Sequence, residues 1–236
     1  MIVGVDQRHR CISLGLSKGR SASATTLHTF SRIALDQEKG LSLDLSNYFW
    51  VNALRQALKR NRREAFSRYF QLATVDASGN PRARTVVYRG LDDDGQSPLF
   101  ITDTRSNKMH NLHLQPVEAC WYFPISREQF RIAGRAEVFT PVHRQHAIIW
   151  RGLSDTARVQ FFWPAPGNVL IDVDSTQESP NSHDISMPPE SFCVVAIRPE
   201  RIDHLCLGNP QQRIVSEINN ALERFDYAWT AVEVTP

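Results

Sequence analysis

Four side chains between residues 84 and 108 have the chemistry needed to hold a phosphate group. They are Arg84, Thr102, Ser106 and Lys108, which are two cations and two hydroxyl groups. Cations make charge-assisted hydrogen bonds with phosphate oxygens, and hydroxyl groups add further donors. The residue types therefore predict a site for a phosphorylated ligand.

Strands are predicted to carry most of these residues. Residues 69–75 are rich in aromatic and β-favouring residues, and they lead into the turn-forming run 76–81. Residues 82–89 follow as the returning strand, so a hairpin is expected here. Further strands are predicted at 98–102, 117–123, 127–139, 192–198, 201–207, 213–218 and 229–234.

Helices are expected only beside these strands. One begins near Ser46 or Asn47, and its residues Trp50, Val51 and Leu54 share an apolar face. Shorter helices are predicted at 106–114, 141–150 and 154–162, and an irregular loop at 163–189, which is rich in Pro, Ser, Asn and Asp. Consecutive strands with peripheral helices favour a mainly β, antiparallel barrel, because a doubly wound sheet needs a helix after nearly every strand.

The length of 236 residues fits one barrel domain, which we place at residues 43–236. Residues 1–42 are predicted to be a flexible N-terminal extension. Their acid-poor composition, with Arg and Ser, weakly resembles an organelle transit peptide. A flexible tail, or a start codon assigned too far upstream, is the favoured interpretation.

Composition argues against nucleic acid and membrane partners. The formal net charge is only +2, with no long run of like charge, and no stretch approaches the roughly 20 apolar residues of a membrane helix. The four cysteines lie far apart without a Cys-x-x-Cys pair, which is typical of reduced thiols. These features predict a cytoplasmic location.

Motifs for metal, hydrolase or dinucleotide chemistry are not evident in the sequence. The pairs His110/His113 and His143/His146 have a spacing that can converge on a metal from a helix, but neither has Cys or a carboxylate at a companion spacing. No metal site is therefore expected. The chain also lacks the Gly-x-Ser-x-Gly elbow and the Gly-x-Gly-x-x-Gly fingerprint.

The region between residues 84 and 135 resembles the flavin-binding half of the pyridoxamine 5'-phosphate oxidase family, whose members are split β-barrel dimers that hold FMN. The similar segments are Arg84-Thr85-Val86-Val87-Tyr88-Arg89, Ile101-Thr102, Ser106-Asn107-Lys108 and the run from Gln129 to Gly134, which matches Gln-Val-Arg-Ile-x-Gly. The likeness is closest to a branch of predicted FMN-binding proteins from cyanobacteria and plants.

This resemblance implies an antiparallel split barrel that forms a homodimer, with FMN in a cleft between the two subunits. It implies FMN contacts from Arg84, Thr85, Val86, Val87, Arg89, Ile101, Thr102, Ser106, Asn107, Lys108, Gln129 and Arg213. Substrate contacts are implied for Arg89 and Arg151. No catalytic protein residue is assigned, because flavin N5 accepts the hydride in such a reaction.

Several positions depart from the family pattern. Asn107 replaces an Arg, which removes one positive charge from the phosphate-binding residues. Arg89 replaces a Lys that touches the substrate phosphate. Asp155 falls where a phosphate-binding Ser is usual, and Asn209 and Gln211 stand where the family has a substrate-binding Arg and His. These changes are compatible with a flavin site, and they predict weak use of pyridoxine 5'-phosphate.

Several functions remain open at this point. The favoured one is an FMN-dependent oxidoreductase acting on an unknown small substrate. The alternatives are a true pyridox(am)ine 5'-phosphate oxidase, a flavin-binding module without turnover, and a split barrel that binds another cofactor or none.

Overall fold

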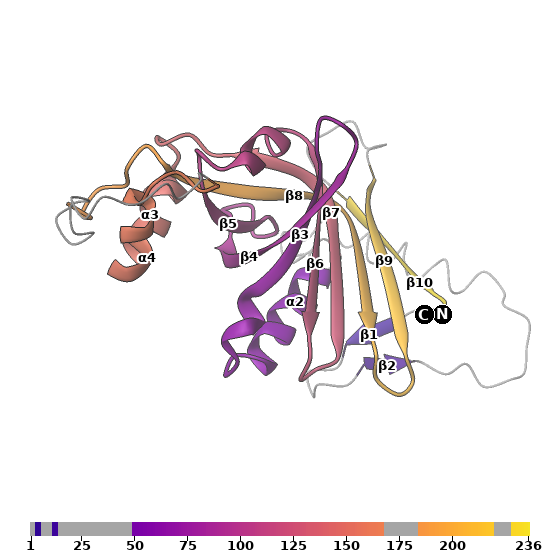
Figure 1. Cartoon of the computed structure of the whole chain (residues 1–236). Coiled ribbons are helices and arrows are strands. Elements are labelled where there is room, and N and C mark those ends of the chain that lie inside the picture. The colour runs from indigo at the N-terminus through magenta and orange to yellow at the C-terminus, as the bar shows by residue number, and fades with distance from the viewer. Residues whose placement is uncertain (1–2, 6–10, 14–48, 168–183, 220–227) are drawn as a thin grey trace, which may run out of the picture.

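The computed structural model describes residues 3–5, 11–13, 49–167, 184–219 and 228–236 (Figure 1). Eight strands form one antiparallel sheet within these residues. The strands are β3 (Tyr69–Val75), β4 (Pro81–Leu91), β5 (Pro98–Asp103), β6 (Pro116–Phe123), β7 (Glu128–Val138), β8 (Phe192–Cys206), β9 (Gln212–Asn219) and β10 (Ala228–Val234).

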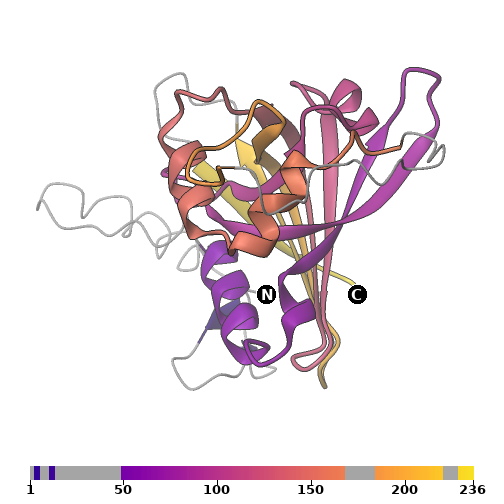
Figure 2. The ribbon, with the colours of Figure 1, turned by 60° about the vertical axis from the view of Figure 1, so that its left-hand side comes forward.

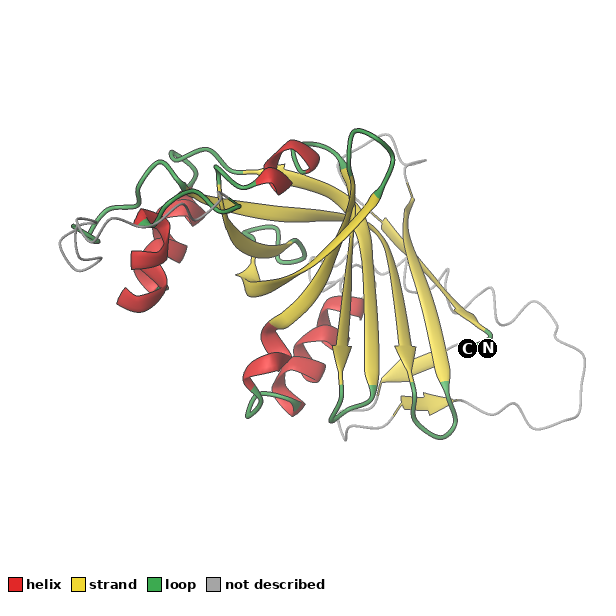
Figure 3. Cartoon of the chain, in the orientation of Figure 1, coloured by secondary structure: helices red, strands yellow, loops and turns green. Residues whose placement is uncertain are grey.

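The helices are short and lie outside the sheet (Figure 3). They are α2 (Phe49–Arg60), α3 (Arg144–Gly152) and α4 (Asp155–Val159), with the 3-10 turns η3 (Ala65–Arg68), η4 (Asn107–Asn111) and η5 (Gln160–Phe162). The segment predicted as a helix at 106–114 is thus a short 3-10 turn. The one predicted at 154–162 divides into α4 and η5. None of the helices in the described residues is long and apolar enough to cross a membrane.

The N-terminal extension is described only in part. Two short strands, β1 (Val3–Val5) and β2 (Cys11–Ser13), pair with each other in an antiparallel hairpin that is separate from the main sheet. The rest of the predicted extension, and most of the predicted loop at 163–189, lies outside the described residues.

The barrel closes because β8 pairs with β7 along one edge and with two different strands along the other. Residues 192–196 of β8 pair with β5, whereas residues 201–206 pair with β9. The circuit β8-β5-β4-β3-β6-β7 then returns to β8 through the β7–β8 pairing. The strands β9 and β10 extend from the lower half of β8 (Figure 1).

The sequence prediction of two strands at 192–198 and 201–207 is wrong in one respect: β8 is a single strand of 15 residues. Pro199 and Glu200 lie at a bulge, where the β7–β8 register shifts between Ala133 and Gly134. A side chain at Gly134 would overlap the carbonyl oxygen of Arg198. Glycine therefore allows the two strands to pass this point without separating.

The core follows the period-2 alternation of the strands. In β3 the side chains of Phe70, Leu72 and Thr74 point inward, and the residues between them are exposed. Trp121 lies fully buried at the centre, with its Nε1 donating to the Ser67 carbonyl at 2.9 Å. Helix α2 packs its predicted apolar face, which includes Trp50, against the core of the barrel.

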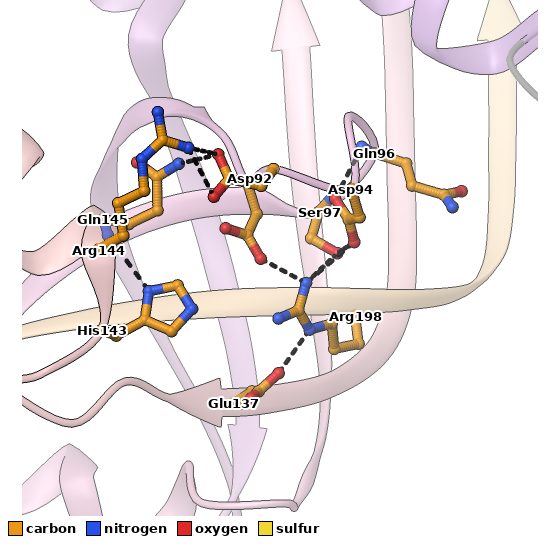
Figure 4. A network of polar contacts seen from close by, with 10 residues as sticks. Asp92, Asp94, Gln96, Ser97, Glu137, His143, Arg144, Gln145 and Arg198 are labelled. Carbon is orange, nitrogen blue, oxygen red and sulfur yellow. Dashed lines mark hydrogen bonds and ion pairs between the residues drawn. The ribbon is translucent and has the colours of Figure 1, made fainter.

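An ion-pair network joins the β4–β5 turn to the barrel wall (Figure 4). The Arg198 guanidinium on β8 donates to Asp92 at 2.7 Å, to Asp94 at 2.9 Å and to Glu137 on β7 at 2.5 Å. Three carboxylates converge on one planar group whose donors have fixed directions, so the turn is held against β7 and β8.

Helix α3 is tied to the same turn by a neighbouring contact. Arg144 and Gln145 both donate to the Asp93 carboxylate, at 2.9 Å and 2.8 Å. The His143 side chain caps the helix by accepting from the Gln145 backbone N–H. A second apolar cluster, which contains Trp150, Phe161 and Phe192, packs α3 and η5 onto the upper half of β8.

Candidate flavin site

A cleft of about 450 Å³ opens beside β4 and β5. One wall comes from these strands and η4, through Thr85, Val86, Val87, Arg89, Ile101, Thr102, Asp103 and Lys108. The facing wall comes from α4, η5 and the residues after them, through Ala157, Gln160, Phe161, Trp163, Pro164 and Pro166. Figure 2 shows α3 and α4, in orange-red, above α2 in purple.

Lys108 is hydrogen-bonded to two of the other predicted phosphate-binding residues, Thr102 and Ser106. The Lys108 Nζ lies 2.8 Å from Thr102 Oγ1 and 2.9 Å from Ser106 Oγ. Both hydroxyl groups are buried, which fixes the ammonium at the end of the cleft. Burial lowers the pKa of Lys108, the nearby Arg84 lowers it further, and Asp103 opposes the shift.

Arg84 on β4 is the fourth member of this group. Its Nη1 donates to Thr74 Oγ1 at 2.6 Å and to the Leu72 carbonyl at 3.3 Å, which holds the guanidinium beside the barrel wall. Burial lowers the pKa of Arg84, and so does the neighbouring positive charge of Arg82.

The nearby carboxylate of Asp103 offsets only part of the positive charge of the cluster. Within the described part of the chain, Arg84 and Lys108 form no ion pair, and Asp103 pairs with Arg105 at 2.6 Å. Two cations and two hydroxyl groups in a partly buried cluster are the donors that an anion site needs.

Arg89 contributes to the cleft a buried donor that has no partner in the described part of the chain. Its Nε is buried and has no hydrogen-bond partner among the described residues. Burial lowers the pKa of Arg89, and the adjacent positive charge of Arg68 lowers it further, while Tyr69 opposes the shift. Buried donors in folded proteins nearly always have a partner, so this group is suited to an acceptor on a bound ligand.

Sequence reasoning did not identify the second wall of the cleft. The Phe161 carbonyl accepts from Ser191 Oγ at 2.6 Å and from Arg105 Nη2 at 3.3 Å, which fixes η5 against the end of β5. Trp163 remains 49% exposed at the rim. The aromatic run 161–163 followed by two prolines was the only local signal, and such residues are equally common in ordinary loops.

Gln129 and Arg213 lie away from this cleft. Gln129 on β7 and Arg213 on β9 are both paired with Leu205 on β8, one on each side of that strand. The cleft, in contrast, is lined by β4 and β5. Arg213 donates twice to Asp203, at 2.9 Å and 2.7 Å. These hydrogen bonds hold the pKa of Asp203 below its usual value, with burial opposing.

Four further predicted residues are not among those that line the cleft: Arg84, Ser106, Asn107 and Arg151. The same holds for Asp155, a position that departs from the family pattern. Arg151 is exposed on α3, where its Nε donates to the Ala147 carbonyl at 3.3 Å. The Asn107 amide lies close to Gly167, just beyond the proline-containing wall. Asp155 is exposed and lies 3.6 Å from Arg158 one turn later in α4.

Comparison with known proteins agrees with this architecture. Residues 47–140 match the model of the pyridoxamine 5'-phosphate oxidase FMN-binding domain. The chain is 32% identical over 194 residues to pyridoxine/pyridoxamine 5'-phosphate oxidase 2 of Arabidopsis thaliana, which covers 79% of this chain and 96% of the relative.

Solved structures show the same fold. A pyridoxamine 5'-phosphate oxidase-related, FMN-binding protein of Nostoc punctiforme superposes with a TM-score of 0.69 at 38% identity, covering 79% of this chain and 97% of its own. PhzG of Burkholderia lata, solved with tetrahydrophenazine-1-carboxylic acid, superposes with a TM-score of 0.64 at 17% identity, covering 84% and 98%. With its split barrel, its basic cleft and this similarity along nearly the whole Arabidopsis protein, the chain belongs to the pyridoxamine 5'-phosphate oxidase-like family of FMN-binding proteins.

Proposed function

We propose that the protein binds FMN in the cleft beside β4 and β5 and uses it to transfer a hydride to or from a small substrate. The observation that carries this proposal is the Lys108, Thr102 and Ser106 cluster next to Arg84, which offers two cations and two hydroxyl groups to a phosphate. The cleft volume of about 450 Å³ is within the usual range for small-molecule sites.

The cleft residues divide into two roles in this proposal. Arg84 and Lys108 hold the phosphate by charge-assisted hydrogen bonds, with Thr102 and Ser106 as neutral partners. Val87, Phe161 and Trp163 exclude water from the flat ring and restrict its tilt. When bound, FMN supplies the hydride acceptor at N5, so the protein contributes orientation and electrostatics.

Gln129 and Arg213 support a homodimer with FMN between the subunits. They lie on strands that do not line the cleft of their own subunit, yet the resemblance assigns both to the flavin. A second copy of the chain would bring these side chains to the cofactor.

The flavin proposal is tested by titrating apoprotein with FMN and following the quenching of flavin fluorescence. Saturable binding at one FMN per chain is expected. Protein concentrations up to about 1 mM would detect a binding free energy as weak as about −4 kcal/mol. The proposal fails if FMN fluorescence is unchanged throughout this range.

Turnover distinguishes an enzyme from a flavin-binding module. Anaerobic mixing of the FMN complex with candidate donors should bleach the oxidised flavin spectrum for at least one of them. If bound flavin resists every donor of a broad panel but is readily reduced by dithionite, the module without turnover is the correct alternative.

True pyridox(am)ine 5'-phosphate oxidase is the second candidate, favoured by the name of the Arabidopsis relative. We expect pyridoxine 5'-phosphate to be a poor substrate because Asn209, Gln211 and Asp155 replace the family Arg, His and Ser. Three lost contacts of about 2 kcal/mol each would lower kcat/KM by up to about 10⁴-fold, an upper figure because neighbouring contacts are not additive. Oxygen consumption at about 1 per second or faster, within tenfold of a median enzyme, would restore the oxidase assignment.

A further inference from the structure

A second group of chemically active side chains lies at the other end of β8 from the cleft. Phe192, the first residue of β8, packs on the cleft wall, whereas His204 and Cys206 close the strand beside the β8–β9 hairpin (Figure 1). Glu128, the first residue of β7, is directly opposite Cys206 in the strand register.

The three side chains converge on a single point. The His204 Nε2 lies 3.0 Å from Glu128 Oε2 and 3.4 Å from Cys206 Sγ, and all three atoms lie within 4.8 Å of one another. The Glu128 and His204 side chains are only 6% and 7% exposed, and Cys206 is partly exposed. The group is therefore enclosed on the barrel side and open at the thiol.

This geometry does not fit a nucleophilic triad. In such a triad the acid bonds one ring nitrogen and the nucleophile faces the other, so that the imidazole can pass a proton between them. Here the carboxylate and the thiol face the same Nε2.

We propose that Glu128, His204 and Cys206 form a binding site for a zinc-type divalent cation. Imidazole nitrogen, thiolate sulfur and carboxylate oxygen are the ligands that zinc takes, and thiolate disfavours Mg²⁺ and Ca²⁺. A tetrahedral ion with bonds of about 2.0 to 2.3 Å needs its ligand atoms roughly 3.3 to 3.8 Å apart. The separations of 3.0 Å and 3.4 Å from His204 Nε2 lie close to this range, and the third separation is at most 4.8 Å. The fourth position faces the open side, where water would complete the coordination.

The surrounding contacts hold the ligands in place. The His204 ring stacks on Phe130, with centroids 4.0 Å apart and an interplanar angle of 11°. Arg60 of α2 donates to Glu128 Oε1 at 2.7 Å, which leaves Oε2 directed at His204. Such supporting contacts orient ligands at known metal sites and strengthen their affinity.

Coordination would connect three elements that are distant in sequence. The ion would join the start of β7 to the end of β8, and Arg60 would link both to α2. On binding, the Cys206 thiol proton passes to solvent, and the thiolate sulfur bonds the metal. A structural role follows, because the site lies apart from the residues that line the cleft.

Zinc binding to the full-length, FMN-loaded protein tests the site. After treatment with a chelator and gel filtration, protein is dialysed against buffered free zinc and its metal content is measured by mass spectrometry. One zinc per chain is expected, and Cys206→Ser should weaken binding at least tenfold. Cys120→Ser is the matched control, because Cys120 is also partly buried on a strand but lies beside Glu118 and Arg131.

The result can overturn the proposal in two ways. Wild-type protein that takes up clearly less than one zinc at micromolar free metal has no such site. If wild type and Cys206→Ser bind zinc equally, the bound zinc lies elsewhere. The same conclusion follows if Cys206→Ser and Cys120→Ser lose zinc to the same extent. Flavin absorbance of each variant shows that the barrel is intact, so a folding failure is not mistaken for a lost ligand.

Discussion

Lys108 illustrates how burial gives a common residue type a specific chemistry. A lysine on a loop is usually solvated, but here the ammonium lies between Thr102 and Ser106, and burial lowers its pKa. An anion that enters this position gains an electrostatic interaction that water screens less than at the surface. The same reasoning applies to Arg89, whose buried Nε has no partner among the described residues.

Replacing Lys108 by Ala should weaken FMN binding. The variant loses a charge-assisted hydrogen bond of about 1.5 to 3 kcal/mol, which corresponds to a dissociation constant roughly 10- to 150-fold higher. Fluorescence titration measures the change. Lys59→Ala, an exposed lysine in the last turn of α2, is the control and should bind FMN as wild type does. Unchanged affinity in Lys108→Ala would remove the phosphate cluster from the flavin site.

Cys193 should be unreactive in the folded protein. Burial raises the pKa of its thiol to about 11, so the thiolate appears only as the pH approaches that value. At pH 8, mass spectrometry should find Cys193 unmodified after iodoacetamide treatment of native protein and fully modified in denaturant. Equal labelling rates in the two states would show that this part of β8 opens readily.

At the scale of elements, β8 decides the shape of the molecule. Its upper half belongs to the barrel through β5, and its lower half carries β9 and β10. A strand with Pro199 near its centre is unusual, because proline lacks the N–H that a central strand donates. The bulge opposite Gly134 accommodates it.

Gly134→Ala should destabilise the protein. The new methyl group would collide with the backbone oxygen of Arg198, so β7 or β8 must move, at a cost of about 1 to 3 kcal/mol. Urea denaturation should show a lower midpoint with an unchanged slope. Gly152→Ala is the control, because no atom lies within 4 Å of the position its Cβ would take. Equal midpoints in the two variants would mean that the bulge tolerates a side chain.

The ion pairs across β7, β8 and β9 predict a pH dependence of stability. Asp203 accepts two hydrogen bonds from Arg213, with Arg131 and Arg201 nearby, and these arginines lower the pKa of its carboxyl group while burial opposes. A lowered carboxyl pKa contributes stability above the unfolded value of about 3.9, and this is lost as the pH falls through the folded value.

Asp203→Asn should therefore be less stable than wild type by about 1 to 3 kcal/mol at pH 7, and the difference should shrink below about pH 4. Denaturation curves across this pH range measure it. Asp155→Asn is the control, because the Asp155 carboxylate is exposed and lies 3.6 Å from Arg158. This substitution should change the free energy of unfolding by at most about 0.5 kcal/mol. A constant difference at all pH values would exclude this ion pair as the cause.

At the scale of the whole molecule, the residues that the family resemblance assigns to flavin fall into two groups on different parts of one subunit. The cleft uses β4, β5 and η4, whereas Gln129 and Arg213 lie on the row across β7 and β9. A dimer with two-fold symmetry could bring the second group of one subunit to the cleft of the other, because in such an interface residue i of one subunit contacts residue j of its partner and residue j contacts residue i.

Light scattering should give a mass of about twice the 26.9 kDa chain. Arg213→Ala should also weaken FMN binding, although Arg213 lies outside the cleft of its own subunit. Arg135→Ala is a suitable control, because Arg135 is exposed and contacts exposed Glu200 and the Leu114 carbonyl. A monomer that binds FMN with wild-type affinity would contradict the dimer.

The sequence by itself determined most of the strands, the helix α2 and the group of cations and hydroxyl residues predicted to bind phosphate. Alternation and turn residues are local properties, so β3, β4 and β7 were predicted nearly to their ends, and Thr102, Ser106 and Lys108 are close enough in sequence to meet. Only the tertiary structure decided that β8 is continuous, because that depends on a contact between Gly134 and Arg198. It also decided the second wall of the cleft, from Ala157 to Pro166, and the meeting of Glu128 with His204, 76 residues apart. The physical reason is that closure of the barrel determines which distant residues become neighbours. The spacing of residues along the chain does not indicate which strands pair to close it.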